Sequence, residues 1–275
     1  MTETKVYEML LELIKSKASN ARITDSELNN YFVPEGILFK QNYLQRLASS
    51  LQNSGMMHNS IRFNESKERY DHIKKVLCDF DAKKVLKKYN DWKDLYDALT
   101  NKGDLDNGTQ KDTNDKKTNW GKYAKGLYDG VVFLEKKDGN QMITNLCESP
   151  VEDYELVNKI EEIKKIEKNI HGLGFALVCD WLKECGCTWL AKPDTHIKIV
   201  CSAISKVIDP NKVNAEMTDI DIIKFVFKFA KGIQPDHPDA TAYKLDKIIW
   251  LICTGNFYLQ KDKIGRETIL SKLKN

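Results

Sequence analysis

The chain has little excess charge, because its 43 basic residues nearly balance its 40 acidic residues and leave a net charge of +3. Such a balance permits a nucleic-acid partner without demanding one, and any basic surface would have to be local. The chain also lacks an apolar stretch long enough for a membrane helix, so we expect no membrane partner. Residues 1–17 carry acidic side chains and lack the basic start and long apolar run of a signal peptide.

The seven cysteines do not suggest a disulfide framework, because an odd number cannot pair completely. Such usage fits a reducing compartment, where thiols stay free. Cys185 and Cys187 are separated by one residue, which is too close for the usual zinc knuckle. We therefore expect no metal site. We also expect a cytoplasmic protein, located in the bacterial cytoplasm or nucleoid, or in the nucleus if the source is eukaryotic.

Strand-like alternation of apolar and polar residues is rare, and the sequence shows no internal repeat. Apolar residues instead recur at intervals of three or four, which is the spacing of a buried helix face. The runs that show this spacing are Val6 to Ile14, Leu44 to Leu51, Ile73 to Leu77, Leu156 to Ile163, Ile222 to Phe229 and Leu245 to Ile252. Hydrophobic residues make up 41% of the chain, which is enough for a substantial core. The sequence predicts an all-α protein.

A polar segment divides the chain. Residues 101–119 are rich in Asn, Asp, Lys and Gly and cannot bury a core, so they should form a flexible loop or linker. The segment separates N-terminal helices in residues 1–100 from a middle region in residues 120–210. Residues 211–275 hold further helices, and residues 217–219 cap the first of them, which runs from about Ile220 to Ala230.

The segment from Ile170 to Lys198 carries the clearest functional pattern. Gly172 and Gly174 form a tight turn between two helix-forming runs, and Asp194 heads a further helix. A helix N-terminus behind a glycine turn attracts anions, because its N–H groups lack partners and the helix dipole is positive there. Asp194 fits a helix N-cap, worth about 1 kcal/mol. Its carboxylate would also stabilise positive charge that develops on a sugar.

With these two motifs in this order, the chain resembles the helix-hairpin-helix DNA glycosylases that carry a Gly/Pro-rich loop and a catalytic aspartate (the HhH-GPD superfamily). Gly172-Leu173-Gly174 matches their hairpin, and residues 193–197 match the loop in which Asp194 is the catalytic residue. The resemblance implies two helical lobes with a DNA-binding cleft between them. Residues 1–100 would share one lobe with residues 211–275, residues 120–210 would form the hairpin lobe, and Asp194 would lie in the cleft. No cofactor is implied, and we expect a monomer.

One departure from the family pattern bears on the reaction. Bifunctional members place a lysine two residues after the second hairpin glycine, where this chain has Ala176. A lysine amine there would attack the sugar and form a Schiff base, which leads to strand cleavage. The chain therefore resembles the monofunctional members, which leave an abasic site. Lys192 is open to three readings: a displaced amine nucleophile, a phosphate contact or a solvated lysine. The single C-terminal cysteine, Cys253, excludes the four-cysteine iron–sulfur loop of some members.

The resemblance also indicates which residues would contact DNA. The phosphate-binding candidates are His171, Gly172, Leu173, Gly174 and Lys192. An enzyme that flips a base out of a duplex must fill the gap, and residues 49–59 correspond to the region that does so in the family. The gap-filling candidates there are Gln52, Asn53 and Met57, although the same residues equally fit an ordinary loop after a helix C-terminus.

Aromatic rings stack on an extruded base, although most aromatic residues belong to the core. The pocket candidates are Trp120, Tyr123, Trp250 and Phe257. Residues 246–259 resemble the closing helix of the superfamily, so Asp246 and Lys247 are either two further residues that reach the cleft or part of a solvated helix start.

Three hypotheses follow. The first is a monofunctional DNA glycosylase that flips a damaged or modified base from double-stranded DNA and hydrolyses its N-glycosidic bond. Oxidised or alkylated purines, mispaired uracil or thymine, and hypermodified cytosine of phage DNA all remain open as targets, the last of which would imply anti-phage defence. The second is a non-catalytic sensor of distorted DNA with the same fold. The third is an unrelated helical interaction protein, which would show no salt-dependent affinity for DNA.

Overall fold

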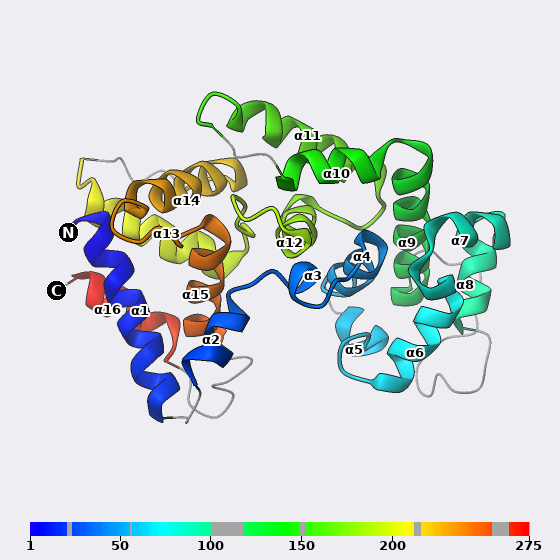
Figure 1. Ribbon diagram of the computed structural model, residues 1–275, viewed down its shortest axis with the longest axis horizontal. Helices are drawn as coiled ribbons and strands as arrows, with labels where there is room; N and C mark the ends of the chain where they lie inside the picture. Colours follow the sequence, from blue (N-terminus) through cyan, green and yellow to red (C-terminus); the bar gives the residue numbers. More distant parts are fainter. Residues whose placement is uncertain are drawn as a thin grey trace. The chain divides into compact units, whose positions relative to one another are not determined.

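The computed structural model describes residues 1–20, 24–55, 57–100, 118–148, 152–211, 216–254 and 264–274 (Figure 1). These residues form helices joined by turns, and none of them lies in a strand, which confirms the predicted all-α class. Most of the predicted linker, residues 101–117, lies outside the described residues. No helix in the described part of the chain is long and apolar enough to cross a membrane.

The chain forms two compact units. The first contains residues 1–38 and 186–275, and the second contains residues 39–185. These boundaries differ from the ranges expected from the sequence. The N-terminal region contributes only its first 38 residues to the unit of the C-terminal helices. The segment that carries Asp194 belongs to that unit as well, and the glycine turn belongs to the other.

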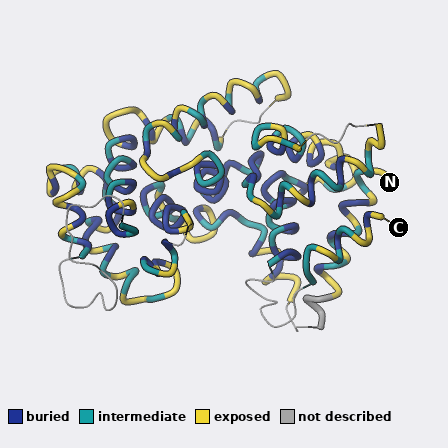
Figure 2. Tube along the Cα trace, turned by 180° about the vertical axis from the view of Figure 1, so that it is seen from behind, coloured by how far each residue is buried: buried dark blue, intermediate teal, exposed yellow. Residues whose placement is uncertain are grey.

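The first unit is built around α13. Its helices are α1 (Glu3–Asn20), α2 (Asp25–Tyr31), α3 (Glu35–Leu38), α13 (Thr195–Ile208), α14 (Asp219–Ile233), α15 (Ala242–Thr254) and α16 (Arg266–Lys274). Helix α13 packs against α14, α15 and α16, and α1 packs against α14 and α15. Three of the stripes predicted from the sequence meet in one core, in which Leu10, Val226 and Ile249 are fully buried. Buried and exposed positions alternate along most of the helices (Figure 2).

The start of α14 confirms one predicted cap. Thr218 accepts a hydrogen bond from the Asp221 N–H at 3.2 Å, and the Asp221 carboxylate accepts one from the Thr218 N–H at 3.0 Å. This reciprocal pair is a capping box, which satisfies two donors that a helix start leaves unpaired. The helix continues to Ile233, three residues beyond the predicted end.

The second unit is organised by α9. Its helices are α4 (Tyr43–Leu51), α5 (Met57–Ile61), α6 (Lys67–Val76), η1 (Cys78–Phe80), α7 (Ala82–Lys88), α8 (Trp92–Thr100), α9 (Asn119–Lys136), α10 (Gly139–Glu148), α11 (Leu156–Asn169) and α12 (Phe175–Cys185). Helix α9 contacts α4, α5, α7, α8, α10 and α11, and α12 packs against α4, α10 and α11.

Two glycines of α9 permit this close packing. A Cβ at Gly130 would lie 2.0 Å from Cδ2 of Leu47, and a Cβ at Gly126 would lie 2.6 Å from Cδ2 of Leu51. The same Gly126 Cβ would lie 2.7 Å from the carbonyl oxygen of His171. Glycine in a helix interior costs about 1 kcal/mol relative to alanine. Here the loss is offset by packing that any side chain would block.

Candidate functional site

The predicted glycine turn joins α11 to α12. Gly172 has φ of +75°, in the left-handed region that favours glycine. A Cβ at either Gly172 or Gly174 would meet no atom within 4 Å, so the outer side of the turn is open. The carbonyl oxygen of Gly174 accepts hydrogen bonds from the N–H groups of Leu177 at 2.8 Å and Val178 at 3.0 Å, which starts α12.

The inner side of the turn is held by contacts with the rest of the second unit. The Leu173 side chain is 1% exposed, and the Ile170 side chain is 2% exposed. The N–H of His171 donates to Oδ2 of Asp129 at 3.2 Å, which ties the turn to α9. The turn therefore shows its glycine backbone to solvent while its apolar side chains anchor it.

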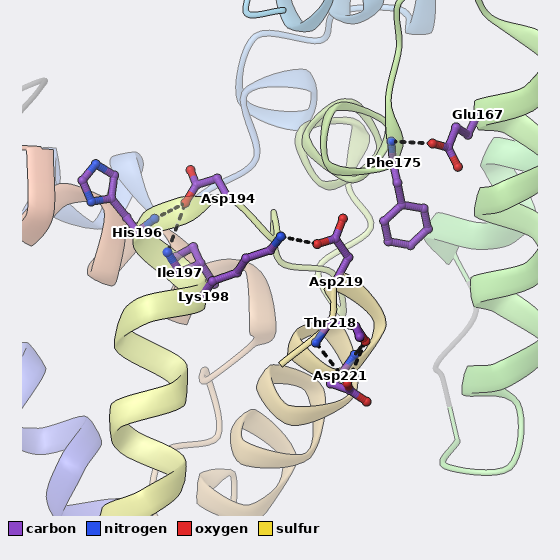
Figure 3. Close-up of polar contacts among 9 residues, drawn as sticks. All are labelled: Glu167, Phe175, Asp194, His196, Ile197, Lys198, Thr218, Asp219 and Asp221. Carbon is purple, nitrogen blue, oxygen red and sulfur yellow. Dashed lines mark hydrogen bonds and ion pairs between the residues drawn. The ribbon is translucent and has the colours of Figure 1, made fainter. Parts of the chain in front are cut away.

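Two backbone amides of the turn and the start of α12 have acceptors within the protein. The Phe175 N–H donates to Oε1 of Glu167 at 3.0 Å (Figure 3), and the Leu173 N–H donates to the carbonyl oxygen of Ile170 at 3.3 Å. The Glu167 carboxylate caps the positive end of α12, where a negative group is favoured. A phosphate that bound the Phe175 amide would have to replace this carboxylate.

Asp194 is the N-cap of α13, as its position before residues 195–197 predicts. Its backbone is extended, and its Oδ1 accepts hydrogen bonds from the N–H groups of His196 at 2.9 Å and Ile197 at 3.1 Å (Figure 3). Within the described residues, Oδ2 of Asp194 has no hydrogen-bond partner, and the residue is partly exposed. One oxygen thus fixes the carboxylate, and the other remains available.

A buried carboxylate supports the segment before Asp194. Asp246 of α15 is 2% exposed, and its Oδ1 accepts a hydrogen bond from the Lys192 N–H at 2.8 Å. The carbonyl oxygen of Lys192 in turn accepts a hydrogen bond from the Asp194 N–H at 2.8 Å. Asp246 therefore holds Lys192, the residue whose carbonyl oxygen accepts the hydrogen bond from the Asp194 N–H.

Two buried thiols share this region. Burial raises the pKa of Cys201, and the negative charges of Asp246 and Asp194 raise it further. Burial also raises the pKa of Cys253 to about 11, where Arg266 opposes the shift and Asp194 adds to it. Both thiols stay protonated at neutral pH and are poor nucleophiles. Neither thiol therefore competes with Asp194 as a candidate reactive group.

Lys198 and Lys247 have partners within the first unit. The Lys198 ammonium forms an ion pair with Asp219 at the start of α14 (Figure 3). The Lys247 ammonium lies 4.8 Å from the ring centroid of Tyr31 and 5.5 Å from that of Tyr243. Such cation–π contacts hold Lys247 on aromatic faces.

Two of the three gap-filling candidates lie in the core of the second unit. Gln52 is 3% exposed, and its Oε1 accepts a hydrogen bond from the Phe63 N–H at 2.8 Å. Met57 is 2% exposed. Asn53, between them in sequence, is exposed. Burial thus commits Gln52 and Met57 to structural contacts and leaves only Asn53 on the surface.

The aromatic candidates divide in a similar way. Trp120 is 5% exposed and packs edge-on against Tyr123, which is fully buried and donates from its hydroxyl to the Ala48 carbonyl at 2.9 Å. These contacts make both rings core residues of the second unit. Trp250 on α15 is partly exposed, and Phe257 lies outside the described residues.

The sequence patterns did not reveal the roles of Asp129 and Glu167 at the turn, because both sit on helices among many other charged residues. Asp246 carried a sequence signal, since it lies beside the apolar stripe of Leu245, Ile248, Ile249 and Ile252, and the structure buries it on α15. Comparisons of the chain with family models, curated proteins and solved structures found no match.

Proposed function

We propose that the protein is a monofunctional DNA glycosylase that flips a damaged or modified base from a duplex and hydrolyses its N-glycosidic bond. The observation that carries the proposal is the state of Asp194. Two helix amides fix its Oδ1, while Oδ2 has no partner among the described residues. A buried carboxylate, Asp246, steadies the segment that leads to it. This is the arrangement that a catalytic carboxylate requires, with a fixed orientation and a free oxygen.

The chemistry follows from the charge of Asp194. Rupture of the bond between base and sugar leaves positive charge on the sugar, which a fixed carboxylate stabilises. The free oxygen would also orient a water molecule and accept its proton as the water attacks the sugar. The products are the free base and an abasic site.

The turn at Gly172 and Gly174 supports the same proposal. Its open glycine backbone suits a phosphate of the DNA backbone, although the Phe175 amide at the start of α12 is held by Glu167. Ala176 stands where an amine would be needed for a Schiff base, so the proposed enzyme cuts no strand. The target base stays open, with hypermodified cytosine of phage DNA among the candidates.

A base-release assay tests the proposal. Wild-type protein and the Asp194→Asn variant are incubated with genomic DNA that carries diverse modifications, phage DNA included. Released bases are identified by mass spectrometry, and abasic sites are counted before and after alkali. We expect release by the wild type, a loss of about 100-fold or more in the variant, and strand breaks only after alkali. Asp209→Asn, which changes an exposed acid at the other end of α13, serves as the control and should retain activity.

The other outcomes are equally informative. Strand breaks without alkali would show that an amine such as Lys192 acts as nucleophile. Salt-dependent binding to DNA without any release would favour the non-catalytic sensor. An absence of salt-dependent DNA affinity would reject both and favour an unrelated interaction protein.

A further inference from the structure

A cavity of about 560 Å³ lies in the first unit beside α13. Helix α13 turns Ile197, Val200, Cys201 and Ile204 into the core. Its other face lines the cavity together with α16 and the segment before α14. The cavity is therefore separate from Asp194, which caps the end of the same helix.

The floor of the cavity is apolar. Ile199, Ala203 and Val207 line it from α13, and Leu270 lines it from α16. Ile199 is 36% exposed, which is high for an isoleucine beside a core. The stretch of α13 from residue 198 to 207 is about 14 Å long at 1.5 Å per residue. The volume falls in the range of small-molecule sites, about 300–1,000 Å³.

The rim of the cavity is basic. Lys198, Lys206 and Lys274 line it, against one acid, Glu216. Lys198 is held in its ion pair with Asp219. Lys206 and Lys274 are exposed, and no ion pair links either of them to a carboxylate in the described part of the chain. An apolar floor beside two unneutralised ammonium groups complements a molecule with an apolar body and an anionic head.

We propose that this cavity binds a small anionic amphiphile, a carboxylate on an unbranched apolar body. The apolar body lies along Ile199, Ala203 and Val207, and the carboxylate lies between the ammonium groups of Lys206 and Lys274. The site is independent of the proposed glycosylase function, because it uses neither Asp194 nor the glycine turn.

Calorimetric titration of the full chain with decanoate tests the proposal, and decanol is the matched neutral probe. We expect one decanoate per chain and an affinity at least about tenfold higher than that of decanol, because only decanoate meets the lysines. Lys206→Glu combined with Lys274→Glu should lower the decanoate affinity at least about tenfold. Lys272→Glu, an exposed lysine of α16 outside the cavity, should leave it unchanged.

Two variants of the floor complete the test. Ala203→Trp fills the cavity and should abolish binding of decanoate. Ile199→Asp places a negative charge on an exposed part of the floor and should do the same without disturbing the core. The circular dichroism spectrum and melting temperature show whether each variant folds. Equal affinity for decanol and decanoate, several decanoates per chain, or full binding by folded Ile199→Asp would each overturn the proposal.

Discussion

The buried Asp246 carboxylate accepts a hydrogen bond from the Lys192 N–H, 54 residues earlier in the chain, at 2.8 Å. The Lys192 carbonyl oxygen accepts a hydrogen bond from the Asp194 N–H. Two consecutive hydrogen bonds therefore join α15 to the candidate catalytic segment. Asp246 does not need to touch a substrate to matter for the reaction. In the proposed enzyme it is a positioning residue.

Replacement of Asp246 should separate positioning from binding. Asp246→Ala leaves the Lys192 N–H without its acceptor and should lower the free energy of unfolding by about 2 kcal/mol. It should also slow base release about tenfold or more through kcat, with little change in the Kd for DNA. Asp246→Asn keeps an oxygen acceptor and should recover most of the free energy of unfolding and most of the rate of base release. Urea denaturation and single-turnover release measure the two effects, and an Asn variant as slow as the Ala variant would argue against positioning.

The capping and catalytic roles of Asp194 should separate as well. Asparagine is as good an N-cap as aspartate, so Asp194→Asn should change stability by less than about 0.5 kcal/mol. Asp194→Ala should cost about 1 kcal/mol, because the His196 and Ile197 amides lose their acceptor. Base release should fall about 100-fold or more in both variants.

Thr218→Ala is the matched control for the cap, since Thr218 caps α14 in the same unit. It should lose a similar free energy of unfolding, about 1 kcal/mol, and keep its activity. Loss of base release in Thr218→Ala would mean that activity follows stability in this unit, and the Asp194 variants would then say nothing about chemistry.

In the proposed enzyme, Glu167 should oppose DNA binding at the glycine turn between α11 and α12. Its carboxylate occupies the Phe175 amide and adds negative charge where a phosphate would bind. Glu167→Gln removes the charge and keeps an acceptor, so we expect affinity for duplex DNA to rise about threefold at low salt and less at high salt. Fluorescence anisotropy measures the affinity for duplex DNA over a series of salt concentrations. Glu161→Gln, on the same helix but paired with Lys164, is the control, and weaker binding by Glu167→Gln would instead mean that the carboxylate holds the hairpin in its binding shape.

Stability should fall in alkaline solution. Burial raises the pKa of Cys253 to about 11, whereas a thiol of an unfolded chain titrates near pH 8.5. Between these values the folded protein binds more protons than the unfolded chain, so the free energy of unfolding decreases as pH rises. We expect the urea midpoint to drop between about pH 9 and pH 11. In Cys253→Ala the urea midpoint should fall less steeply with pH. Identical slopes of midpoint against pH in the two proteins would show that the Cys253 thiol does not cause the loss of stability.

The sequence predicts local features of this protein better than long-range ones. The helical spacing of apolar residues gives the all-α class, and the residues around Thr218 and Asp194 give two caps, because these features depend on neighbours three or four positions away. Burial of Gln52 and Tyr123 is different. It depends on Phe63 and Ala48, whose positions no local pattern specifies. An amide or ring that suits a DNA contact also suits a core contact, and only the packing distinguishes them.

The glycines of α9 have a consequence for the mechanics of the second unit. Gly126 lies against both α4 and the backbone of the turn at His171, so the same position on α9 contacts two neighbouring segments. The backbone of α9 therefore supports the turn directly, with no side chain of residue 126 between them. Any side chain added at Gly126 would push the turn away from the centre of the second unit.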